Sequence, residues 1–494
     1  MKRMKRMNKK NLPLWMMLTI IASLLIACKD GSDVLPSEDE DSIEVHEADS
    51  DYTWNSTDVI PIVLNGTSIT ANNAGVSVAG AVATIKAAGT YSISGTLTNG
   101  QIVVNNEDKG VVRIILNGVD ITSSNSAAIY IKKAGKALVV LADNTQNKLT
   151  DGATYVYDIP ADEEPNAALF SKADLTIFGN GALTVTGKFN DGIASKDGLI
   201  IKSGTLNVTA ADDGIRGKDY LIIKDGAINV TAKTDGLKSN NDENTALGYI
   251  IIEKGTMTIS AGDDGIHAES KLTINGGNIN ITKSYEGIES KIITVNDGTI
   301  HIVSSDDGLN AAGGSSESAT ASGSYYFYMN GGYIWMDANG DGVDVNGTAE
   351  MTGGVIIVNG TTANNNAAVD YDRSFKITGG YLLAVGSSGM AQIPGTSSTQ
   401  NSVLITLTTA QQAGSLVHIQ DSEGKDILTF KSTKKYQSVA FSSPELKKDT
   451  SYDVFLGGSS TGTVTDGLYK DGIYTSGTKA GTVSITSVAT KVKL

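Results

Sequence analysis

Short stretches in which aliphatic and polar residues alternate recur along most of the chain. The stretch 199–208 is followed by similar ones at 221–230, 250–259 and 272–281, each with a glycine turn inside it. Strict alternation places every second residue on the same side of a strand. The pattern predicts an inward-facing set made of Leu206, Val208, Ile228, Val230, Met257, Ile259, Ile279, Ile281, Ile300, Ile302, Ile334 and Met336.

A second motif lies between these stretches: an acidic residue followed by glycine and an aliphatic residue. Its copies are 22, 22, 29, 22, 21 and 34 residues apart, and the two long intervals contain polar insertions at 240–247 and 313–324. A strand-rich unit that repeats about every 22 residues predicts a solenoid with one coil per repeat. The copies begin at Asp191, Asp213, Asp235, Asp264, Glu286, Asp307 and Asp341.

Together the two patterns predict an all-β fold, a right-handed parallel β-helix of about 22 residues per coil with two to three short strands in each coil. Weaker copies near 127–129, 167–171 and 367–370 extend the expected β-helix over residues 57–395. From Asn401 onward, the strand-like stretches 403–407, 416–419 and 452–455 lack the coil period. They predict a β module or cap at 396–494, since the last coil of a solenoid exposes unpaired strand edges.

The first residues have the order of a secretion signal. Basic residues precede an apolar stretch at 12–27, and Leu25-Ile26-Ala27-Cys28 resembles the lipobox of bacterial lipoproteins. We therefore expect a lipoprotein signal peptide at 1–27, lipid attachment at Cys28, and a lipid-anchored protein in the outer membrane or at the cell surface. The acid-rich segment 28–56 predicts an extended tether. It is similar to the surface-export signal of lipoproteins in the Bacteroides group, and a plain periplasmic spacer is the alternative.

Composition limits the partners of the exported part. The net charge of −15 argues against nucleic acid and anionic membrane surfaces. The 55 glycines and only 7 prolines, together with many Thr, Asn, Val and Ile residues, indicate a chain rich in turns and strands. The sequence leaves the oligomeric state open.

The acidic motif predicts a column of carboxylates, because each acid occupies the same position in successive coils. Neighbouring strands lie about 4.8 Å apart, so the carboxylates would repel one another, and basic residues look too few to neutralise them. A calcium ion, which takes six to eight oxygen ligands, would compensate this charge. The glycine is expected to provide a positive φ at a sharp turn. The alternative is that the acids only form turns. The candidate ligands are Asp191, Asp212, Asp213, Asp235, Asp263, Asp264, Glu286, Asp306, Asp307 and Asp341.

Two further rows are expected to face outward. Polar and aromatic side chains on a long flat sheet suit a linear polysaccharide, because they hydrogen-bond to hydroxyls and stack on sugar rings. An ordinary solvated sheet face is the alternative. The first row, two residues after each motif glycine, contains Ala194, Arg216, Lys238, His267, Glu289, Asn310 and Asp344. The second row contains Asn207, Asn229, Thr258, Asn280, His301 and Trp335, and Tyr326, Tyr328 and Tyr333 are additional aromatic candidates.

The repeated Asp-Asp-Gly-Ile units, the Gly-x-Leu/Ile-x-Val/Ile strands and the secretion signal resemble a bacterial family of secreted, carbohydrate-binding β-helix proteins. Its type member is a clostridial protein that binds cellulose and pectic acid and holds calcium between coils, and its fold is similar to that of pectate lyases. The resemblance covers about residues 60–395 and implies polysaccharide binding with Ca²⁺ as cofactor. Glu286, Tyr285 and Thr234 depart from the paired-acid pattern. The implied calcium ligands are Asp212, Asp213, Asp235, Asp263, Asp264, Glu286, Asp306 and Asp307.

Two other functions fit the same pattern. Calcium-dependent polysaccharide lyases use such coils with a basic residue that abstracts a proton, and Arg216, Lys218 or Lys238 would take that role. Paired acids also allow a glycoside hydrolase. A purely adhesive or scaffolding surface protein is the second alternative. Acids in register in every coil favour a repeated structural column over one catalytic pair, so binding without catalysis is the main expectation.

Overall fold

The structure, a computed structural model, describes residues 46–157, 159, 161, 163–313 and 325–494. The expected signal peptide, Cys28, most of the acidic tether and most of the insertion 313–324 lie outside the described residues. The chain divides into two compact units at Thr53 and Trp54. The described part of the first unit contains the short 3-10 helix η1 (Asp49–Tyr52). Within the described ranges, no helix has both the length and the apolar character needed to cross a bilayer.

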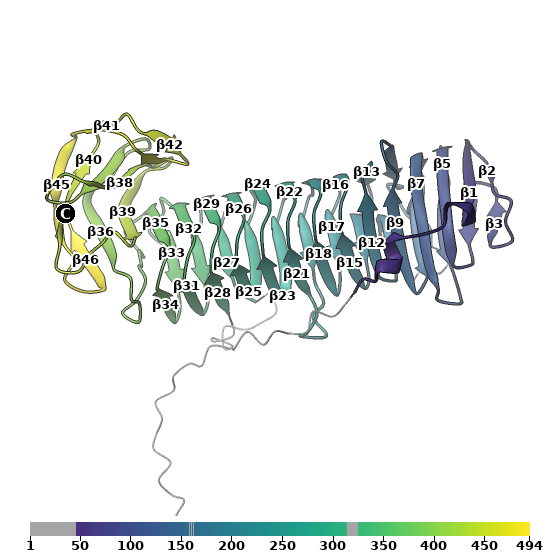
Figure 1. The fold of residues 1–494 in the computed structure, drawn as a ribbon, viewed down its shortest axis with the longest axis horizontal. Helices are drawn as coiled ribbons and strands as arrows, with labels where there is room; N and C mark the ends of the chain where they lie inside the picture. Colours follow the sequence, from purple (N-terminus) through teal and green to yellow (C-terminus); the bar gives the residue numbers. More distant parts are fainter. Residues whose placement is uncertain (1–45, 158, 160, 162, 314–324) are drawn as a thin grey trace, which may run out of the picture. The chain divides into compact units, whose positions relative to one another are not determined.

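The second unit is a β-solenoid of about 11 turns, followed by further sheets at its C-terminal end (Figure 1). Each coil contributes one strand to each of three parallel ladders, which we number I to III in the order in which the chain visits them after an acidic motif. This confirms the expected all-β parallel β-helix. Two antiparallel strands, β2 (Ile69–Thr70) and β3 (Val76–Ala79), pair with the first coil.

The strands of the three ladders follow the coil period closely. Ladder I contains β4 (Val82–Ile85), β6 (Gln101–Asn105), β8 (Ile129–Lys133), β11 (Ala167–Ser171), β14 (Asp191–Ser195), β17 (Ile215–Gly217), β20 (Leu237–Ser239), the starts of β23 (Ile266–Ile274) and β25 (Ile288–Val295), β27 (Leu309–Ala311), β30 (Val343–Val345) and β33 (Val369–Tyr371). Ladder II contains the starts of β1 (Val59–Gly66), β5 (Gly89–Leu97) and β7 (Val111–Thr122), then β9 (Lys136–Leu141), β12 (Leu175–Gly179), β15 (Gly198–Ile201), β18 (Tyr220–Ile223), β21 (Tyr249–Ile252), the ends of β23 and β25, β28 (Tyr326–Met329), β31 (Thr348–Met351) and β34 (Ser374–Ile377). Ladder III contains the ends of β1, β5 and β7, then β10 (Gln146–Thr150), β13 (Ala182–Gly187), β16 (Thr205–Ala210), β19 (Ala227–Thr231), β22 (Thr256–Ser260), β24 (Asn278–Ser284), β26 (Thr299–Ser304), β29 (Tyr333–Ala338), β32 (Val355–Asn359) and β35 (Tyr381–Gly386).

The interior of the solenoid is one continuous aliphatic column. Leu206 pairs in register with Ile228, which pairs with Met257, and the same stack continues through β24, β26 and β29. All the residues that the alternation pattern places inside are buried in this single cluster. Because parallel in-register strands stack like side chains on like, the period-2 pattern alone is sufficient to define the core.

The glycines of the acidic motif do not have the expected positive φ. Within the repeat, glycines with positive φ recur instead in the turn between ladders II and III, as at Gly226 with φ 128° and Gly255 with φ 105°. At Gly236 of the motif, a Cβ atom would lie 2.4 Å from Ile259 Cγ2 and 2.6 Å from the carbonyl oxygen of Gly265 in the next coil. The motif requires glycine because adjacent coils approach too closely for a side chain, which corrects the turn-based explanation.

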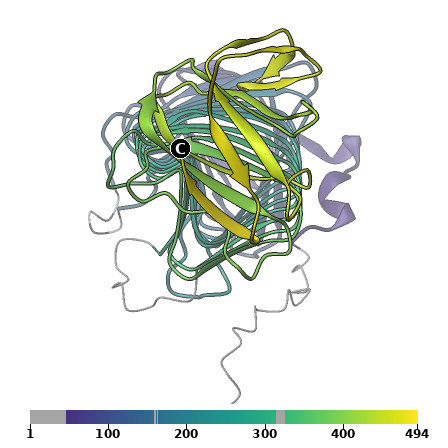
Figure 2. The ribbon, with the colours of Figure 1, turned by 90° about the vertical axis from the view of Figure 1, so that its left-hand side faces the viewer.

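The strands after the solenoid form a C-terminal module, β36 to β46. β39 (Tyr436–Ser442) pairs antiparallel with the last solenoid strand, β35, and with β36 (Ser402–Gln411), which pairs with β46 (Ala489–Lys493). Viewed from this end, the module lies in front of the stacked coils (Figure 2). The remaining strands are β37 (Leu416–Gln420), β38 (Asp426–Lys431), β40 (Ser451–Leu456), β41 (Ser459–Ser460), β42 (Thr463–Thr465), β43 (Leu468–Lys470), β44 (Tyr474–Thr475) and β45 (Thr478–Ser484).

The module also covers one outer side of the solenoid. Ile357 and Leu383, which point outward from ladder III, are buried in a second apolar cluster together with Phe430 and Phe441 of the module. The last ladder III strands are therefore enclosed on both faces, whereas the earlier ones have one face open.

Candidate functional site

Five of the seven motif acids accept a hydrogen bond from a backbone N–H of the next coil, and Asp264 and Glu286 instead contact the side chains of His267 and Asn310. The Asp264 backbone N–H donates to Asp235 Oδ1 at 2.9 Å, and the Asp341 N–H donates to Asp307 Oδ1 at 2.6 Å. The Asp213 N–H makes the same contact with Asp191 at 3.3 Å. One carboxylate oxygen of each of these five acids is thereby used within the fold, and the bond accounts for the acid in those coils without a metal.

A row of cations neutralises the first half of this acidic column. Arg216 Nη2 lies 2.7 Å from Asp191 Oδ2. Lys238 Nζ lies 2.6 Å from Asp235 Oδ2 and 3.3 Å from Asp213 Oδ2. The expectation that basic partners are too few is therefore wrong for these coils. The cations come from the outward row two residues after the motif glycine, and each reaches back to the carboxylates of its own coil and the preceding one.

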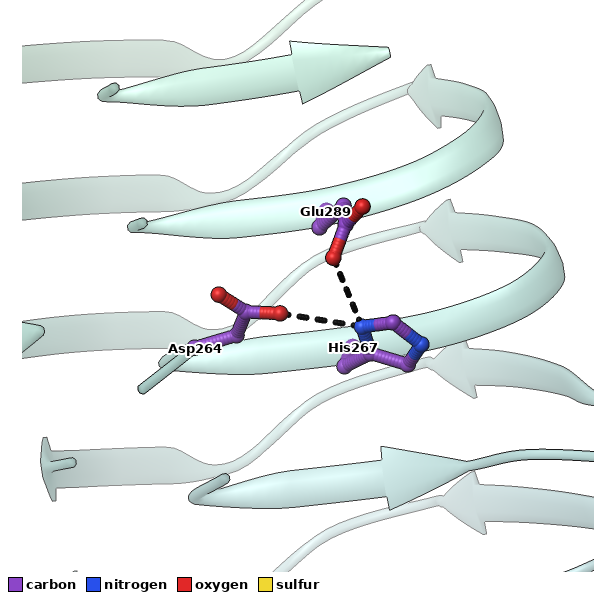
Figure 3. Close-up of side chains that lie close together, drawn as sticks. All are labelled: Asp264, His267 and Glu289. Carbon is purple, nitrogen blue, oxygen red and sulfur yellow. Dashed lines mark hydrogen bonds and ion pairs between the residues drawn. The ribbon is translucent and has the colours of Figure 1, made fainter. Parts of the chain in front are cut away.

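His267 is the next member of the cation row (Figure 3). Its Nδ1 lies 2.9 Å from Asp264 Oδ2 and 2.9 Å from Glu289 Oε2. Burial alone would lower the pKa of His267, but the hydrogen bonds to the two carboxylates raise it to about 10. Both carboxylates therefore favour the protonated form of the imidazole. A protonated His267 would supply positive charge beside both carboxylates, so these acids need no metal ion for charge compensation.

From Glu286 onward, the acidic column is no longer accompanied by cations among the described residues. Burial raises the pKa of Glu286 to about 7, and its Oε2 accepts a hydrogen bond from Asn310 Nδ2 at 2.8 Å. One coil further on, Asp344 occupies the position that Arg216 and Lys238 have in earlier coils. The cations of this row end at His267, because Glu289, Asn310 and Asp344 take the next three positions, and Asp344 adds to the negative charge of the motif acids around it.

Asp307, Asp341 and Asp344 form an acidic triad whose oxygens lie within 4.8 Å of one another. Burial, reinforced by the neighbouring acids, raises their pKa values to about 7, 6 and 7. Among the residues that the structure describes, no Lys, Arg or His nitrogen lies within ion-pair distance of these carboxylates. Asp344 was not among the sequence candidates for metal binding. The signal for it was an acidic residue at the position of the repeat that Arg216, Lys238 and His267 occupy in earlier coils.

The first acids of the doubled pairs are less constrained. Asp212 Oδ1 accepts a hydrogen bond from the Thr234 hydroxyl at 2.7 Å, in a group with Asp191 and Asp213 that already contains Arg216. Asp263 is exposed, and Asp306 is partly buried. These residues line the turn beside the column, and only the motif acids themselves stack in it.

The three basic residues expected for a lyase are held by acids. Arg216 and Lys238 make the ion pairs described above, and Lys218 Nζ lies 3.5 Å from Glu243 Oε1. The carboxylates raise the pKa of Lys238 against the opposing effect of burial. A general base must be unprotonated at its working pH, and the contacts of Lys238 favour its protonated form.

An open polar row runs along ladder III. It consists of Asn207, Asn229, Thr258 and Asn280, which point outward from β16, β19, β22 and β24 in consecutive coils. Asn229, Thr258 and Asn280 are exposed, and Asn207 is half-buried. Asn229 Nδ2 donates to Asn207 Oδ1 at 2.9 Å, so neighbouring amides are aligned along the solenoid axis. The second outward row predicted from the sequence therefore exists as an accessible array over these coils.

The polar row ends where the C-terminal module begins. Asp466, between β42 and β43, has Oδ2 3.0 Å from His301 Nε2 and accepts a hydrogen bond from the Tyr333 hydroxyl at 2.7 Å. Trp335, the next outward residue, packs against the apolar cluster of the module. The indole and the Tyr333 ring thus contact the protein itself, which corrects the expectation that they form an open platform for sugar rings.

The remaining candidates lie on other sides of the coil. Tyr326 and Tyr328 belong to ladder II, where their rings stack with centroids 5.9 Å apart. They share a coil with Trp335 but not a face. Ala194 does point away from the main column, yet it is fully buried beside Ala167 and Phe170. The first outward row is therefore not a continuous solvated surface.

Comparison with known proteins finds a carbohydrate-binding family whose model matches part of the solenoid. Residues 79–319 match the model of a family described as carbohydrate-binding domain-containing protein. A relative with the same description from Acetivibrio thermocellus is 41% identical over 150 residues, which cover 30% of this chain and 52% of the relative. This chain thus spans about half the length of that relative. The polar row and the motifs from Asp191 to Asp307 lie inside the matched residues, and the C-terminal module lies outside them.

A solved structure is also similar to part of the chain. It is described as a polysaccharide lyase-like protein from C. thermocellum, in a gadolinium derivative. The similarity has 36% sequence identity and a TM-score of 0.43, and it covers 52% of this chain and 97% of that one.

Proposed function

We propose that the protein binds a linear polysaccharide along the polar row of ladder III. The observation that carries this proposal is the array itself, with one outward amide or hydroxyl per coil over four consecutive coils and an aligned bond between Asn207 and Asn229. The match of the surrounding residues to a carbohydrate-binding domain model supports it.

The chemistry of the row suits a sugar chain that lies parallel to the solenoid axis. Strands are about 4.8 Å apart, which is close to the length of one pyranose unit, so successive sugars would meet equivalent side chains. Each asparagine amide offers both donors and an acceptor, and threonine does the same with one hydroxyl. The row contains no charged side chain, which favours recognition of hydroxyl groups. Asp466 and the module close its C-terminal end.

Retention on a panel of immobilised cell-wall polysaccharides, each measured with calcium and with chelator, tests this proposal. Binding predicts retention of the intact chain on at least one linear polymer without release of sugar products. Accumulation of unsaturated products from an acidic polymer would instead identify a lyase. Absence of retention on every polymer would contradict polysaccharide binding.

We also propose that calcium stabilises the fold at the acidic triad Asp307, Asp341 and Asp344. Carboxylates are the oxygen donors that calcium prefers, and their pKa values are raised first by burial and then by mutual repulsion, both of which a bound divalent cation would offset. The earlier coils fit a metal less well, because Arg216, Lys238 and His267 already neutralise their acids. The ion would supply charge compensation at this turn, and no catalytic step depends on it.

We also propose, from the sequence, that the protein is exported and anchored by a lipid. The basic residues, the apolar stretch and the Leu25-Ile26-Ala27-Cys28 order support export and lipid attachment at Cys28. An anchored chain would present the solenoid at the outer membrane or the cell surface, where polysaccharides are accessible.

A further inference from the structure

A recess of about 270 Å³ lies between the last coil and the C-terminal module. It is lined by Thr378 after β34, by residues 399–401 before β36, and by Pro444 and residues 446–448 after β39. These strands lie at the C-terminal end of the solenoid in Figure 1. The recess is therefore separate from the polar row, whose residues belong to coils further toward the N-terminus.

Hydrogen bonds between three chain segments fix the floor of the recess. Gln400 is buried, and its Nε2 donates to the Gly380 carbonyl and to Ser442 Oγ, both at 3.0 Å. Asn401 Nδ2 donates to the Leu446 carbonyl at 2.9 Å. The lining residues thus have defined positions without a bound molecule, which lowers the ordering cost of binding.

The charge of the recess is opposite to that of the molecule. The whole chain carries a net charge of −15, yet the recess is lined by Lys447 and Lys448 and by no acidic residue. Lys447 Nζ donates to the Pro444 carbonyl at 2.6 Å, which orients the ammonium group and leaves two of its N–H donors. The adjacent Glu445 is paired with Lys425 on its other side.

The other lining groups are of two kinds. The Thr399 hydroxyl and the Asn401 side-chain oxygen can bond to hydroxyl groups, and the exposed Pro444 supplies apolar surface. A bare inorganic anion would use the lysines alone. A ligand with a carboxylate, several hydroxyls and a ring face with C–H groups would use all three kinds of surface.

We propose that this recess binds a sugar acid, with its carboxylate between Lys447 and Lys448 and its ring against Pro444. The volume admits one monosaccharide unit, so the ligand is a free uronic acid or the terminal unit of an acidic polymer. The choice of a sugar acid over other carboxylates rests on the proposed polysaccharide function. The site itself rests on the recess and its charge.

Saturation-transfer NMR with the intact chain and galacturonic acid as probe tests the site, with galactose and inorganic phosphate as comparison ligands. Galacturonate is expected to bind, to lose affinity by about tenfold in the double variant Lys447→Gln/Lys448→Gln, and to bind more weakly at high salt. Galactose has the same ring without the charge, and it should bind at least tenfold more weakly. Both lysines are exposed, so the melting temperature of the double variant should remain that of the parent.

Lys435→Gln is the matched control, because it removes an exposed lysine of the same module outside the recess. Galacturonate binding that survives the double variant, equal binding of galactose, or equally tight binding of phosphate would each overturn the proposal. The polar-row proposal and this one are tested by different measurements. Loss of polymer retention in polar-row variants with unchanged galacturonate binding would leave this site standing.

Discussion

Each motif glycine lies where a methyl group would collide with the next coil. At Gly236 the obstacles are a backbone carbonyl and a β-branched core side chain, neither of which can swing aside. The backbone of these glycines is compatible with any residue, so the restriction comes only from contact between coils. The sequence revealed the invariant place of glycine in the repeat. It did not distinguish a turn requirement from a packing requirement, because both select the same residue.

Gly236→Ala is therefore expected to lower the free energy of unfolding by about 1–3 kcal/mol, the usual range for overpacking a tight interior. Gly395→Ala is the control, because a Cβ there meets nothing closer than 3.7 Å and φ is not positive. Urea denaturation of both variants measures the difference. Equal stability of the two would show that the coils separate easily, against the packing explanation.

At the scale of one element, the acidic turns fall into two groups, one in which cations compensate the carboxylates and one in which they do not. Arg216, Lys238 and His267 compensate the acids of the earlier coils, whereas Asp344 leaves the later coils uncompensated. The positions of the acids and of the outward row followed from the period. Their pairing did not, because whether a lysine reaches back to the preceding coil depends on the path of a long side chain and not on spacing.

The uncompensated triad makes the metal-free protein sensitive to pH. The pKa values of Asp307, Asp341 and Asp344 lie above the ordinary value of 3.8, so the unfolded chain loses these protons first as the pH rises. The protonated triad therefore contributes fully to the free energy of unfolding below about pH 4, and this contribution is lost as the pH rises through about 7.

Asp344→Asn should flatten this pH dependence. In the presence of chelator we expect the variant to be about 1–3 kcal/mol more stable than the parent at pH 8 and nearly equal to it at pH 4, since one pKa unit corresponds to about 1.4 kcal/mol. Chemical denaturation at the two pH values measures the effect. Exposed Asp108→Asn is the control, with little change at either pH. A parent whose stability rises between pH 4 and pH 8 at the same rate as the variant would contradict the assignment.

Calcium should reverse the loss of stability at pH 8. A ligand that binds only the folded state adds RT ln(1 + [L]/Kd), about 2.7 kcal/mol at a hundred times Kd. Chelation is expected to lower the melting temperature, and calcium to restore it better than magnesium, which requires a regular octahedral shell. Asp344→Asn should weaken this response, and Asp263→Asn, an exposed acid outside the triad, should not. A melting temperature that is indifferent to calcium would remove the metal from the account.

At the scale of the whole molecule, the C-terminal module decides which outward residues are accessible. Alternation within strands correctly separated inward from outward residues along the solenoid. It could not show that a segment more than a hundred residues later covers Tyr333 and Trp335, because burial by a distant element leaves no mark on the local pattern. The same limitation applied to Tyr326 and Tyr328, whose face depends on how the coil turns between strands.

Lipid attachment is also a property of the whole molecule. In the parent protein, the lipid is expected on the sulfur of Cys28. Cys28→Ser removes this attachment point, so the variant should move from the membrane fraction to the soluble fraction. Fractionation of cells that express each form measures this. An unchanged membrane fraction for the variant would contradict the lipoprotein prediction.

The polar row supports the central claim, and a pair of matched double variants tests it most directly. Asn229→Ala/Asn280→Ala removes two amides from ladder III, whereas Asn275→Ala/Asn296→Ala removes two exposed amides from a different edge, where Asn296 Nδ2 donates to Asn275 Oδ1 at 2.8 Å. The two pairs share their chemistry and differ only in their position on the coil.

Retention of both variants and the parent on the best polymer of the panel is the measurement. Loss of hydrogen bonds worth about 0.5–1.5 kcal/mol each predicts about tenfold weaker binding for Asn229→Ala/Asn280→Ala and parental binding for Asn275→Ala/Asn296→Ala. Parental retention of the polar-row variant, or an equal loss in both variants, would contradict polysaccharide binding along ladder III.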